Sequence, residues 1–322
     1  MLTPKTNALP LSTDSLNYLI ERAEQGEADS QFRLGCFYSD IRDYNKAAYW
    51  FKLAAEQGDA DAQYNYGACC YHGKGVFQDN NQAFYWMKKS AEQGHSYAQY
   101  QLGTFYESGI GVPIDYYLAF SWYKKSAEKG FVNSQYNLGV CYYSGRGVKK
   151  DYKQAAFWYT KAAEKDLVSA QYNLAICYYV GCGVEKDYKQ AVFWYTKAAK
   201  QNYDKAQYNL GICYYEGHGV TKDYKEAVNW YYKAAEQGHA SAQCNLGICF
   251  LKGCGVTQDY KEAVMWFEKA ANQELADAQY NLGACYKNGW GVPRDLNKAV
   301  YWYGKAAGQG HTEAQAQLQR LQ

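Results

Sequence analysis

The sequence predicts an all-α solenoid built from repeated pairs of antiparallel helices, and two periodic features carry this prediction. The pair Ala-Gln, replaced by Ser-Gln in two units, returns every 36 residues from Gln63 onward, after a first interval of 32 residues. Tryptophan keeps the same 36-residue spacing at eight positions: Trp50, Trp86, Trp122, Trp158, Trp194, Trp230, Trp266 and Trp302. A period of this length indicates about eight stacked 36-residue repeats, although the length of 322 residues alone would suggest two ordinary domains.

The first helix of the repeating unit is well illustrated by residues 204–215. Ala206, Leu210 and Cys213 lie three and four residues apart, so they fall on one helical face. Gly211 lies in the middle of this helix, where glycine costs about 1 kcal/mol relative to alanine. Because this glycine returns in nearly every unit, we expect the second helix to approach the first closely at this point.

The second helix follows a turn with the sequence Gly-x-Gly-Val at 217–220. Glycine directly after the last turn suits a helix that ends in a residue with left-handed backbone conformation. Asp223 is then expected to cap the second helix, with Glu226 three residues further on. This spacing is that of a capping box, and Asp259 with Glu262 repeats it.

The end of the second helix is marked by Gly238. Asp166, Asn202 and Glu274 replace this glycine in other units. Asp and Asn tolerate a left-handed conformation, whereas Glu tolerates it less well, so we expect Glu274 to fit its position poorly.

Two lone helices flank the complete units. Residues 15–26 have the pattern of a second helix, and residues 312–322 have the pattern of a first helix that ends in a polar run. Polar terminal helices cover the open ends of a stack. We therefore expect eight helix pairs with a capping half-repeat at both ends, forming a single solenoid over 12–322 after a flexible N-terminal segment, 1–11.

Four sequence blocks resemble the Sel-one-like repeat family, a relative of the tetratricopeptide repeats. They are Ala-Gln-Tyr-Asn-Leu-Gly-x-Cys-Tyr-Tyr at 206–215, Gly-x-Gly-Val at 217–220, Asp-Tyr-Lys-x-Ala at 223–227 and Trp-Tyr-x-Lys-Ala-Ala-Glu-Gln-Gly at 230–238. The first unit departs from the pattern because it lacks Gly-x-Gly-Val. The resemblance implies a right-handed superhelix that serves as an adaptor for protein complexes, with function carried over by analogy only.

Charge and hydropathy limit the partners and the compartment. The net charge is +2, from 34 basic and 32 acidic residues, which argues against nucleic acid as a partner. No stretch approaches the roughly 18 continuous apolar residues of a membrane span, and the N-terminus lacks the apolar core of a secretory signal. We expect a cytoplasmic protein without membrane insertion; the sequence does not fix the oligomeric state, and a monomer is expected.

The eleven cysteines indicate packing rather than bridging or metal binding. Six share one position on the apolar side of the first helix, as small buried hydrophobes: Cys69, Cys141, Cys177, Cys213, Cys249 and Cys285. The resemblance includes a cysteine-rich secreted branch that carries Cys at the second Ala of Lys-Ala-Ala. Here that position is Ala235 and its equivalents, so this disulfide framework is excluded and free thiols favour a reducing compartment. The chain has no Cys-x-x-Cys, and we expect no metal and no cofactor.

Catalytic signatures are incomplete. Ser121 with Lys124 and Ser126 with Lys129 match Ser-x-x-Lys, but neither Ser-Asp-Asn nor Lys-Thr-Gly occurs. The Gly-x-Gly turns lack the strand and the third glycine of a dinucleotide site. We therefore expect no catalytic residues and keep a β-lactam-recognising hydrolase only as a distant alternative. His95, His239 and His311 share the position where the chain enters a first helix, which indicates a structural role.

Binding residues are expected on the first helices, which line the concave wall by analogy with the tetratricopeptide superhelix. The tyrosine and asparagine after each Ala-Gln, with residues one and two turns further on, face this groove. The candidates are Tyr136, Asn137, Tyr143, Tyr172, Asn173, Ile176, Tyr179, Tyr208, Asn209, Ile212, Tyr215 and Asn245. Tyr offers a large surface at low entropy cost, and Asn can pair with a peptide backbone. Alternatively, these tyrosines pack against the next repeat and the asparagines bond within their own repeat.

The predicted function is a non-catalytic protein–protein interaction scaffold or adaptor. It would hold a peptide or partner protein in the groove lined by the first helices. A regulatory subunit that activates a partner enzyme is the alternative, and only the partner's identity separates the two. The tryptophan series is interpreted as core or inter-repeat packing, with Trp194→Ala expected to cost about 3 to 5 kcal/mol.

Overall fold

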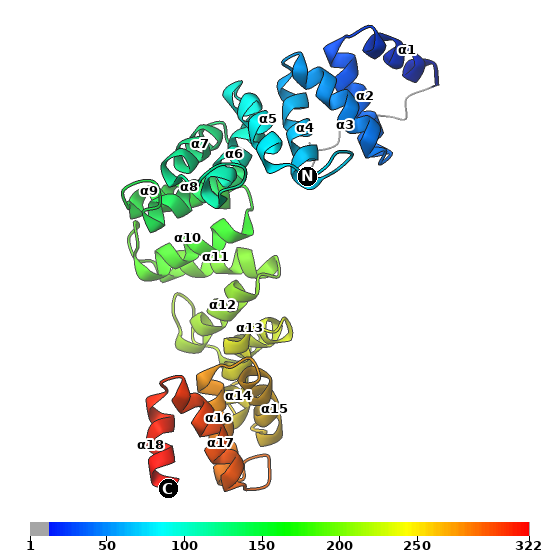
Figure 1. The fold of residues 1–322 in the computed structure, drawn as a ribbon. Coiled ribbons are helices and arrows are strands. Elements are labelled where there is room, and N and C mark those ends of the chain that lie inside the picture. The colour runs from blue at the N-terminus through cyan, green and yellow to red at the C-terminus, as the bar shows by residue number, and fades with distance from the viewer. Residues whose placement is uncertain (1–12, 322) are drawn as a thin grey trace. The chain divides into compact units, whose positions relative to one another are not determined.

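A computed structural model describes residues 13–321, which form eighteen α-helices and no strand (Figure 1). The segment 1–11, for which we expect flexibility, lies outside the described residues. The helices group into two compact units, one ending at Lys165 and one beginning at Asp166.

The first unit contains nine helices. They are α1 (Thr13–Glu24), α2 (Ala28–Asp40), α3 (Tyr44–Glu56), α4 (Ala60–His72), α5 (Asn80–Glu92), α6 (Ser96–Ser108), α7 (Tyr116–Glu128), α8 (Val132–Ser144) and α9 (Tyr152–Ala163). The second unit also contains nine. They are α10 (Val168–Val180), α11 (Tyr188–Lys200), α12 (Asp204–Glu216), α13 (Tyr224–Glu236), α14 (Ala240–Lys252), α15 (Tyr260–Ala271), α16 (Ala276–Asn288), α17 (Leu296–Gly308) and α18 (Thr312–Leu321).

Each complete repeat is one helix pair, from α2–α3 as repeat 1 to α16–α17 as repeat 8. The two helices of a pair pack most extensively on each other. Within each unit, the second helix of a pair then packs on the first helix of the next pair. Helix α1 packs on α2, and α18 packs on α17. This consecutive packing confirms the prediction of eight helix pairs in an α-solenoid arrangement.

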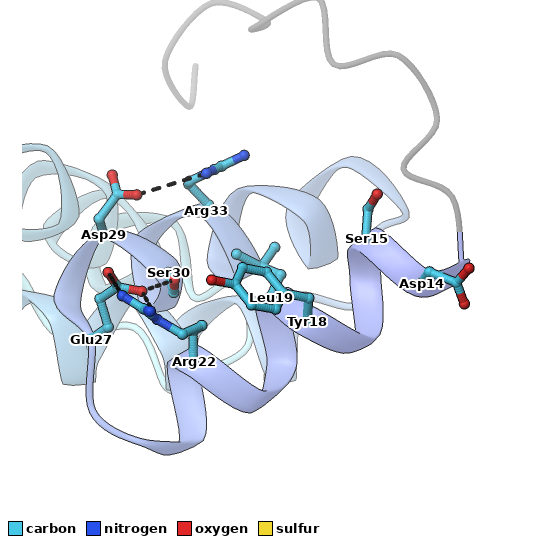
Figure 2. A pocket seen from close by; sticks show the side chains of 9 residues that line it. All are labelled: Asp14, Ser15, Tyr18, Leu19, Arg22, Glu27, Asp29, Ser30 and Arg33. Carbon is cyan, nitrogen blue, oxygen red and sulfur yellow. Dashed lines mark hydrogen bonds and ion pairs between the residues drawn. The ribbon is translucent and has the colours of Figure 1, made fainter.

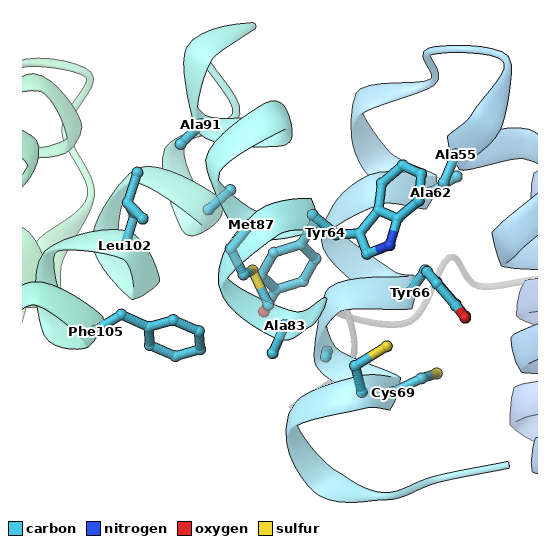
Figure 3. Packing of buried hydrophobic residues seen from close by; sticks show 14 of the residues in the cluster. Ala55, Ala62, Tyr64, Tyr66, Cys69, Ala83, Met87, Ala91, Leu102 and Phe105 are labelled. Atoms are coloured by element: carbon cyan, nitrogen blue, oxygen red, sulfur yellow. The ribbon is translucent and has the colours of Figure 1, made fainter. Parts of the chain in front are cut away.

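The core of each pair is built from small residues on one helix facing large residues on the other. A Cβ added to Gly211 of α12 would lie 2.6 Å from the Tyr231 ring of α13, so the predicted close approach is confirmed. In repeat 2, Met87 of α5 takes the place of the aromatic ring and lies between α4 and α6 (Figure 3). Repeat 5 carries Ala175 at the glycine position, so the packing can open enough for one methyl group.

The turn between the two helices follows the sequence prediction at the first helix and departs from it at the second. Gly217 ends α12 with φ of 79°, in the left-handed region. Asp223 caps α13 by accepting bonds from the backbone N–H groups of Lys225 (2.9 Å) and Glu226 (3.1 Å). The predicted capping box is wrong in its second half: the N–H of Asp223 donates to the carbonyl of Tyr214 in α12, which removes the donor that Glu226 would need.

The same correction applies to the repeat that follows. The Asp259 side chain caps α15, and its N–H donates to the Phe250 carbonyl of α14. The cap residue therefore ties the start of each second helix to its own first helix instead of closing a local box.

The ends of the second helices adopt the left-handed conformation whichever residue is present. Gly238 has φ of 88°, and Asp166, Asn202 and Glu274 have φ of 59°, 63° and 62°. For residues other than Gly, Asn and Asp this conformation is unfavourable. Glu274 therefore carries the backbone strain that the sequence predicts for it.

The Ala-Gln pair forms a buried hydrogen-bond relay that joins three helices. In repeat 2, Gln63 Nε2 donates to the Ala55 carbonyl of the preceding second helix (3.1 Å). Gln93, at the end of the second helix of the same repeat, donates its own Nε2 to Gln63 Oε1 (2.8 Å). We call these three groups the amide relay. The second-helix glutamine completes it in repeats 1, 2 and 5–8 through Gln57, Gln93, Gln201, Gln237, Gln273 and Gln309.

The relay is incomplete in repeats 3 and 4. Lys129 and Lys165 stand where the other repeats have the second glutamine. Their ammonium groups donate to the backbone carbonyls of Gly94 and Gly130 instead. As a result, Oε1 of Gln99 and Oε1 of Gln135 are buried without a hydrogen-bond partner.

Cysteine and tryptophan occupy the predicted packing positions. The six cysteines that share the first-helix position are buried, and burial raises the pKa of the Cys213 thiol, for example, to about 12. Trp86, Trp194 and Trp266 are buried, with exposed fractions of 8%, 8% and 3%. The other five in the series are half-buried. Trp266 also contacts the Tyr232 ring of the preceding repeat, as expected for inter-repeat packing.

Candidate partner-binding face

The twelve candidate residues lie on first helices, on α8 in the first unit and on α10, α12 and α14 in the second. Gln171, Leu174 and Cys177 on the opposite side of α10 are buried. The candidates are all half-buried except Tyr143, which is 39% exposed. On each of these helices they lie on a side that is only partly buried, which we call the first-helix face.

Some residues of this face form contacts with neighbouring helices. The Tyr172 ring lies 6.0 Å from the Tyr195 ring and 5.2 Å from the Tyr203 ring. Asn209 Nδ2 donates to the Tyr172 hydroxyl across repeats 5 and 6 (3.3 Å). This bond crosses between repeats, whereas Asn65 at the equivalent position of repeat 2 donates within its own helix, to the Asp61 carbonyl (2.9 Å).

The middle residue of the Gly-x-Gly turn joins the same face, and sequence reasoning missed it. His218 stacks on the Tyr188 ring (4.6 Å between centroids), and its Nδ1 lies 2.9 Å from the Tyr179 hydroxyl. In the next turn, Cys254 interacts with Tyr215. The residue between the two glycines differs from turn to turn, and this variation at a fixed position is the sequence signal that could have identified it. The residues are Arg146, Cys182, His218, Cys254 and Trp290.

A cavity of about 370 Å³ opens on the first-helix face between α12 and α14. Its lining residues are Ile212, Tyr215, Glu216, Tyr231, Asn245, Ile248 and Lys252. Tyr231 is buried at 2% exposure, and burial raises the pKa of its phenol, a shift that interaction with Asn245 opposes. Ile212, Tyr215 and Asn245 are sequence candidates, so the structure brings these three together around one hollow.

A larger, polar cavity of about 620 Å³ lies between α1 and α2 (Figure 2). Its charged groups other than Asp14 already have partners: Arg22 binds both carboxylate oxygens of Glu27 (2.6 and 2.9 Å), and the Ser30 hydroxyl donates to the same carboxylate. The bond from Arg22 is the main cause that lowers the pKa of Glu27 to about 2. Asp29 pairs with Arg33 at 3.8 Å. This cavity therefore offers a ligand fewer unsatisfied charges than the one between α12 and α14.

The histidines at the start of the first helices cap those helices. His95 Nδ1 accepts a bond from the Ala98 N–H (3.1 Å), and His239 and His311 do the same for Ala242 and Ala314. Burial lowers the pKa of His95 and of His239, which keeps the accepting nitrogen unprotonated. This geometry agrees with the structural role expected from the sequence.

The Ser-x-x-Lys matches have structural partners. Ser126 is buried, donates to the Ser96 carbonyl (2.8 Å) and accepts a bond from the Ser134 hydroxyl (2.7 Å). Lys129 binds the Gly94 carbonyl, and Lys124 pairs with Glu128 at 3.9 Å. Among residues 13–321, no three His, Cys, Asp or Glu side chains gather as metal ligands. In the same range, no helix has the length and apolar character needed to cross a membrane.

Stacked helix pairs that share one pattern of buried core residues define a class of repeat solenoid. The family model for the Sel1 repeat matches eight consecutive segments: 28–59, 60–95, 96–131, 132–167, 168–203, 204–239, 240–275 and 276–311. The chain therefore belongs to the Sel1 repeat family, as the sequence resemblance indicated.

Two solved structures illustrate the similarity. A protective antigen of uropathogenic Escherichia coli strains, described as displaying an SLR fold, is 38% identical, with a TM-score of 0.88. That match covers 94% of this chain but only 66% of the antigen, so the chain spans just under two thirds of it. A Sel1 repeat protein from Oxalobacter formigenes is 34% identical, with a TM-score of 0.74, covering 100% of this chain and 96% of that one. A comparison with curated proteins gave no match.

Sel1 repeat proteins are generally protein-interaction scaffolds, and their fold is typically non-catalytic.

Proposed function

We propose that this protein is a non-catalytic scaffold or adaptor that binds a peptide or a partner protein on its first-helix face. The observation that carries the proposal is the hollow between α12 and α14, where apolar, phenolic and amide groups converge. Convergent polar groups around an apolar hollow are typical of binding sites. The buried thiols of the repeats support a reducing compartment, and we keep the cytoplasm as the proposed location.

The test changes the face without breaking the links between repeats. Alanine at Tyr172 or Asn209 would also remove their mutual hydrogen bond. Ile176→Glu combined with Ile248→Glu instead places two charges on half-buried positions of α10 and α14. The matched control is Met265→Glu with Val300→Glu, which adds the same charges to exposed positions of second helices.

The measurement is a quantitative pull-down from source lysate after circular dichroism has shown unchanged helix content. We expect the face variant to lose specific partners that the parent and the control retain. Partners that survive in the face variant but not in the control would move the site to the second helices. If the parent captures no specific partner, the scaffold proposal is wrong.

A further inference from the structure

The cavity between α12 and α14 lies between two opposite charges at equivalent positions of neighbouring repeats. Glu216 is the last residue of α12, and Lys252 is the last residue of α14, 36 residues later. Both are exposed. Neither forms an ion pair with another residue of the described chain. Lys222 is close enough to interact with Glu216 but does not pair with it.

The position of Glu216 is electrostatically unfavourable for the fold. The C-terminal end of a helix carries a partial negative charge, which favours cations and disfavours carboxylates within the last turn. The residues at this position in repeats 1–8 are Asp40, His72, Ser108, Ser144, Val180, Glu216, Lys252 and Asn288. Asp40 is a second carboxylate at this position, but a carboxylate and a lysine occupy it in neighbouring repeats only across the cavity. This pair of opposite charges around the cavity favours a ligand that carries both a basic and an acidic group.

The cavity can hold an apolar group beside the polar groups of Tyr215, Asn245, Glu216 and Lys252. Ile212 and Ile248 face it from the two first helices, and the buried Tyr231 lies behind them on α13. A volume of about 370 Å³ is at the small end of ligand pockets, which measure about 300–1,000 Å³. It has room for one large side chain or two small ones rather than for a folded element.

We propose that this cavity binds an extended peptide segment whose apolar side chain enters between Ile212 and Ile248, with a basic residue on the Glu216 side and an acidic residue on the Lys252 side. The inference rests on the proposed function and specifies the chemistry of the partner. Glu216 and Lys252 line the cavity from two different helices, so the basic and acidic residues of the ligand flank the apolar residue on its two sides.

The experiment selects peptides from a random library displayed on phage, with the full chain as bait. The variant Glu216→Lys combined with Lys252→Glu exchanges the two charges at the helix ends. The matched control, Glu226→Lys combined with Lys261→Glu, makes the same exchange on the exposed starts of α13 and α15. In both pairs one change is favourable and the other unfavourable for a helix end, so their effects on stability are balanced. Circular dichroism checks the fold, and Glu216→Gln and Lys252→Gln serve singly if the exchange variant unfolds.

We expect the parent and the control to enrich peptides with an apolar residue between a basic and an acidic one. Fluorescence polarisation should show about 10-fold weaker binding of the best peptide to the exchange variant, because two attractive charge pairs become repulsive. A peptide with its two charged residues exchanged should regain the lost affinity when it binds that variant. Enriched peptides that bind parent and exchange variant equally would overturn this inference and leave the proposed function standing. A parent that enriches no peptide would overturn peptide binding altogether.

Discussion

Repeats 3 and 4 of the first unit and repeats 6–8 of the second share a core but differ in how they satisfy one buried amide. In repeats 6–8 the glutamine of Ala-Gln donates to a carbonyl and accepts from a second glutamine. In repeats 3 and 4 the donor is replaced by lysine, and the buried oxygens of Gln99 and Gln135 have no partner. A buried polar atom without a partner costs about 1–3 kcal/mol.

The difference shows that equal repeats need not contribute equally to stability. In a solenoid, total stability is close to a sum of repeat and interface contributions, so a local defect weakens its own neighbourhood. We therefore expect backbone amides near Gln99 and Gln135 to exchange with solvent faster than their equivalents near Gln207 and Gln243.

The largest effect is expected from the tryptophan series. Trp194→Ala, in the second unit, should lower the free energy of unfolding by about 3 to 5 kcal/mol because it empties a buried site. Trp122→Ala, in the first unit, should cost clearly less because that ring is half-buried and lies under Lys125. Urea denaturation followed by circular dichroism gives both values, and hydrogen exchange shows which helices loosen. Equal losses in the two variants would contradict the burial difference.

The second largest loss of stability is expected from substitutions in the amide relay. Gln243→Ala removes a bond to the Ala235 carbonyl and the acceptor for Gln273, so it should cost about 2 kcal/mol. Gln99→Ala removes a hydrogen bond to the Ala91 carbonyl, but it also removes a buried oxygen that has no hydrogen-bond partner. The free energy of unfolding should therefore fall by about 1 kcal/mol or less. Urea midpoints of the two variants, measured side by side, test the comparison. If Gln99→Ala proves the more damaging change, the incomplete relay is not a defect.

Completing the relay should stabilise the first unit. Lys129→Gln gives Gln99 the donor that Gln93 gives Gln63, so we expect a gain of about 1 kcal/mol. Lys153→Gln removes the same charge from an exposed helix position and is the control. Thermal unfolding should show a higher midpoint for Lys129→Gln only. A lower midpoint would mean that the bond from Lys129 to the Gly94 carbonyl contributes more than the relay does.

The helix ends could be predicted from the sequence because they depend on nearby residues. Asp223 caps a helix that begins one residue later, and Gly217 ends one directly before it, so a short window contains the cause. The capping box failed because the competing acceptor, the Tyr214 carbonyl, comes from the preceding helix. Local patterns predict local bonds and miss competition from a neighbouring element.

The relay and the cavity depend on residues that are brought together only by stacking. Gln207 marks the period in the sequence, but its partner Gln237 lies 30 residues further on, and nothing local pairs them. The first-helix face was predictable from helical periodicity. The cavity within it was not, because it depends on how side chains of α12, α13 and α14 fill the space between them. Alignment of the repeats on one another would have revealed Glu216 and Lys252 as a pair of opposite charges.

The smallest expected effect concerns the strained helix end in repeat 7. Glu274→Gly should stabilise the second unit by about 0.5 to 1 kcal/mol, because relief of the left-handed strain exceeds the entropy that glycine loses on folding. Gly238→Glu, at the equivalent position of repeat 6, should have the opposite sign. Because the added Cβ at Gly238 meets no atom within 4 Å, any loss there arises from the backbone conformation alone. Matched urea titrations of the two variants would therefore measure the same conformational term twice, and effects of the same sign would show that repeats 6 and 7 do not share one backbone geometry.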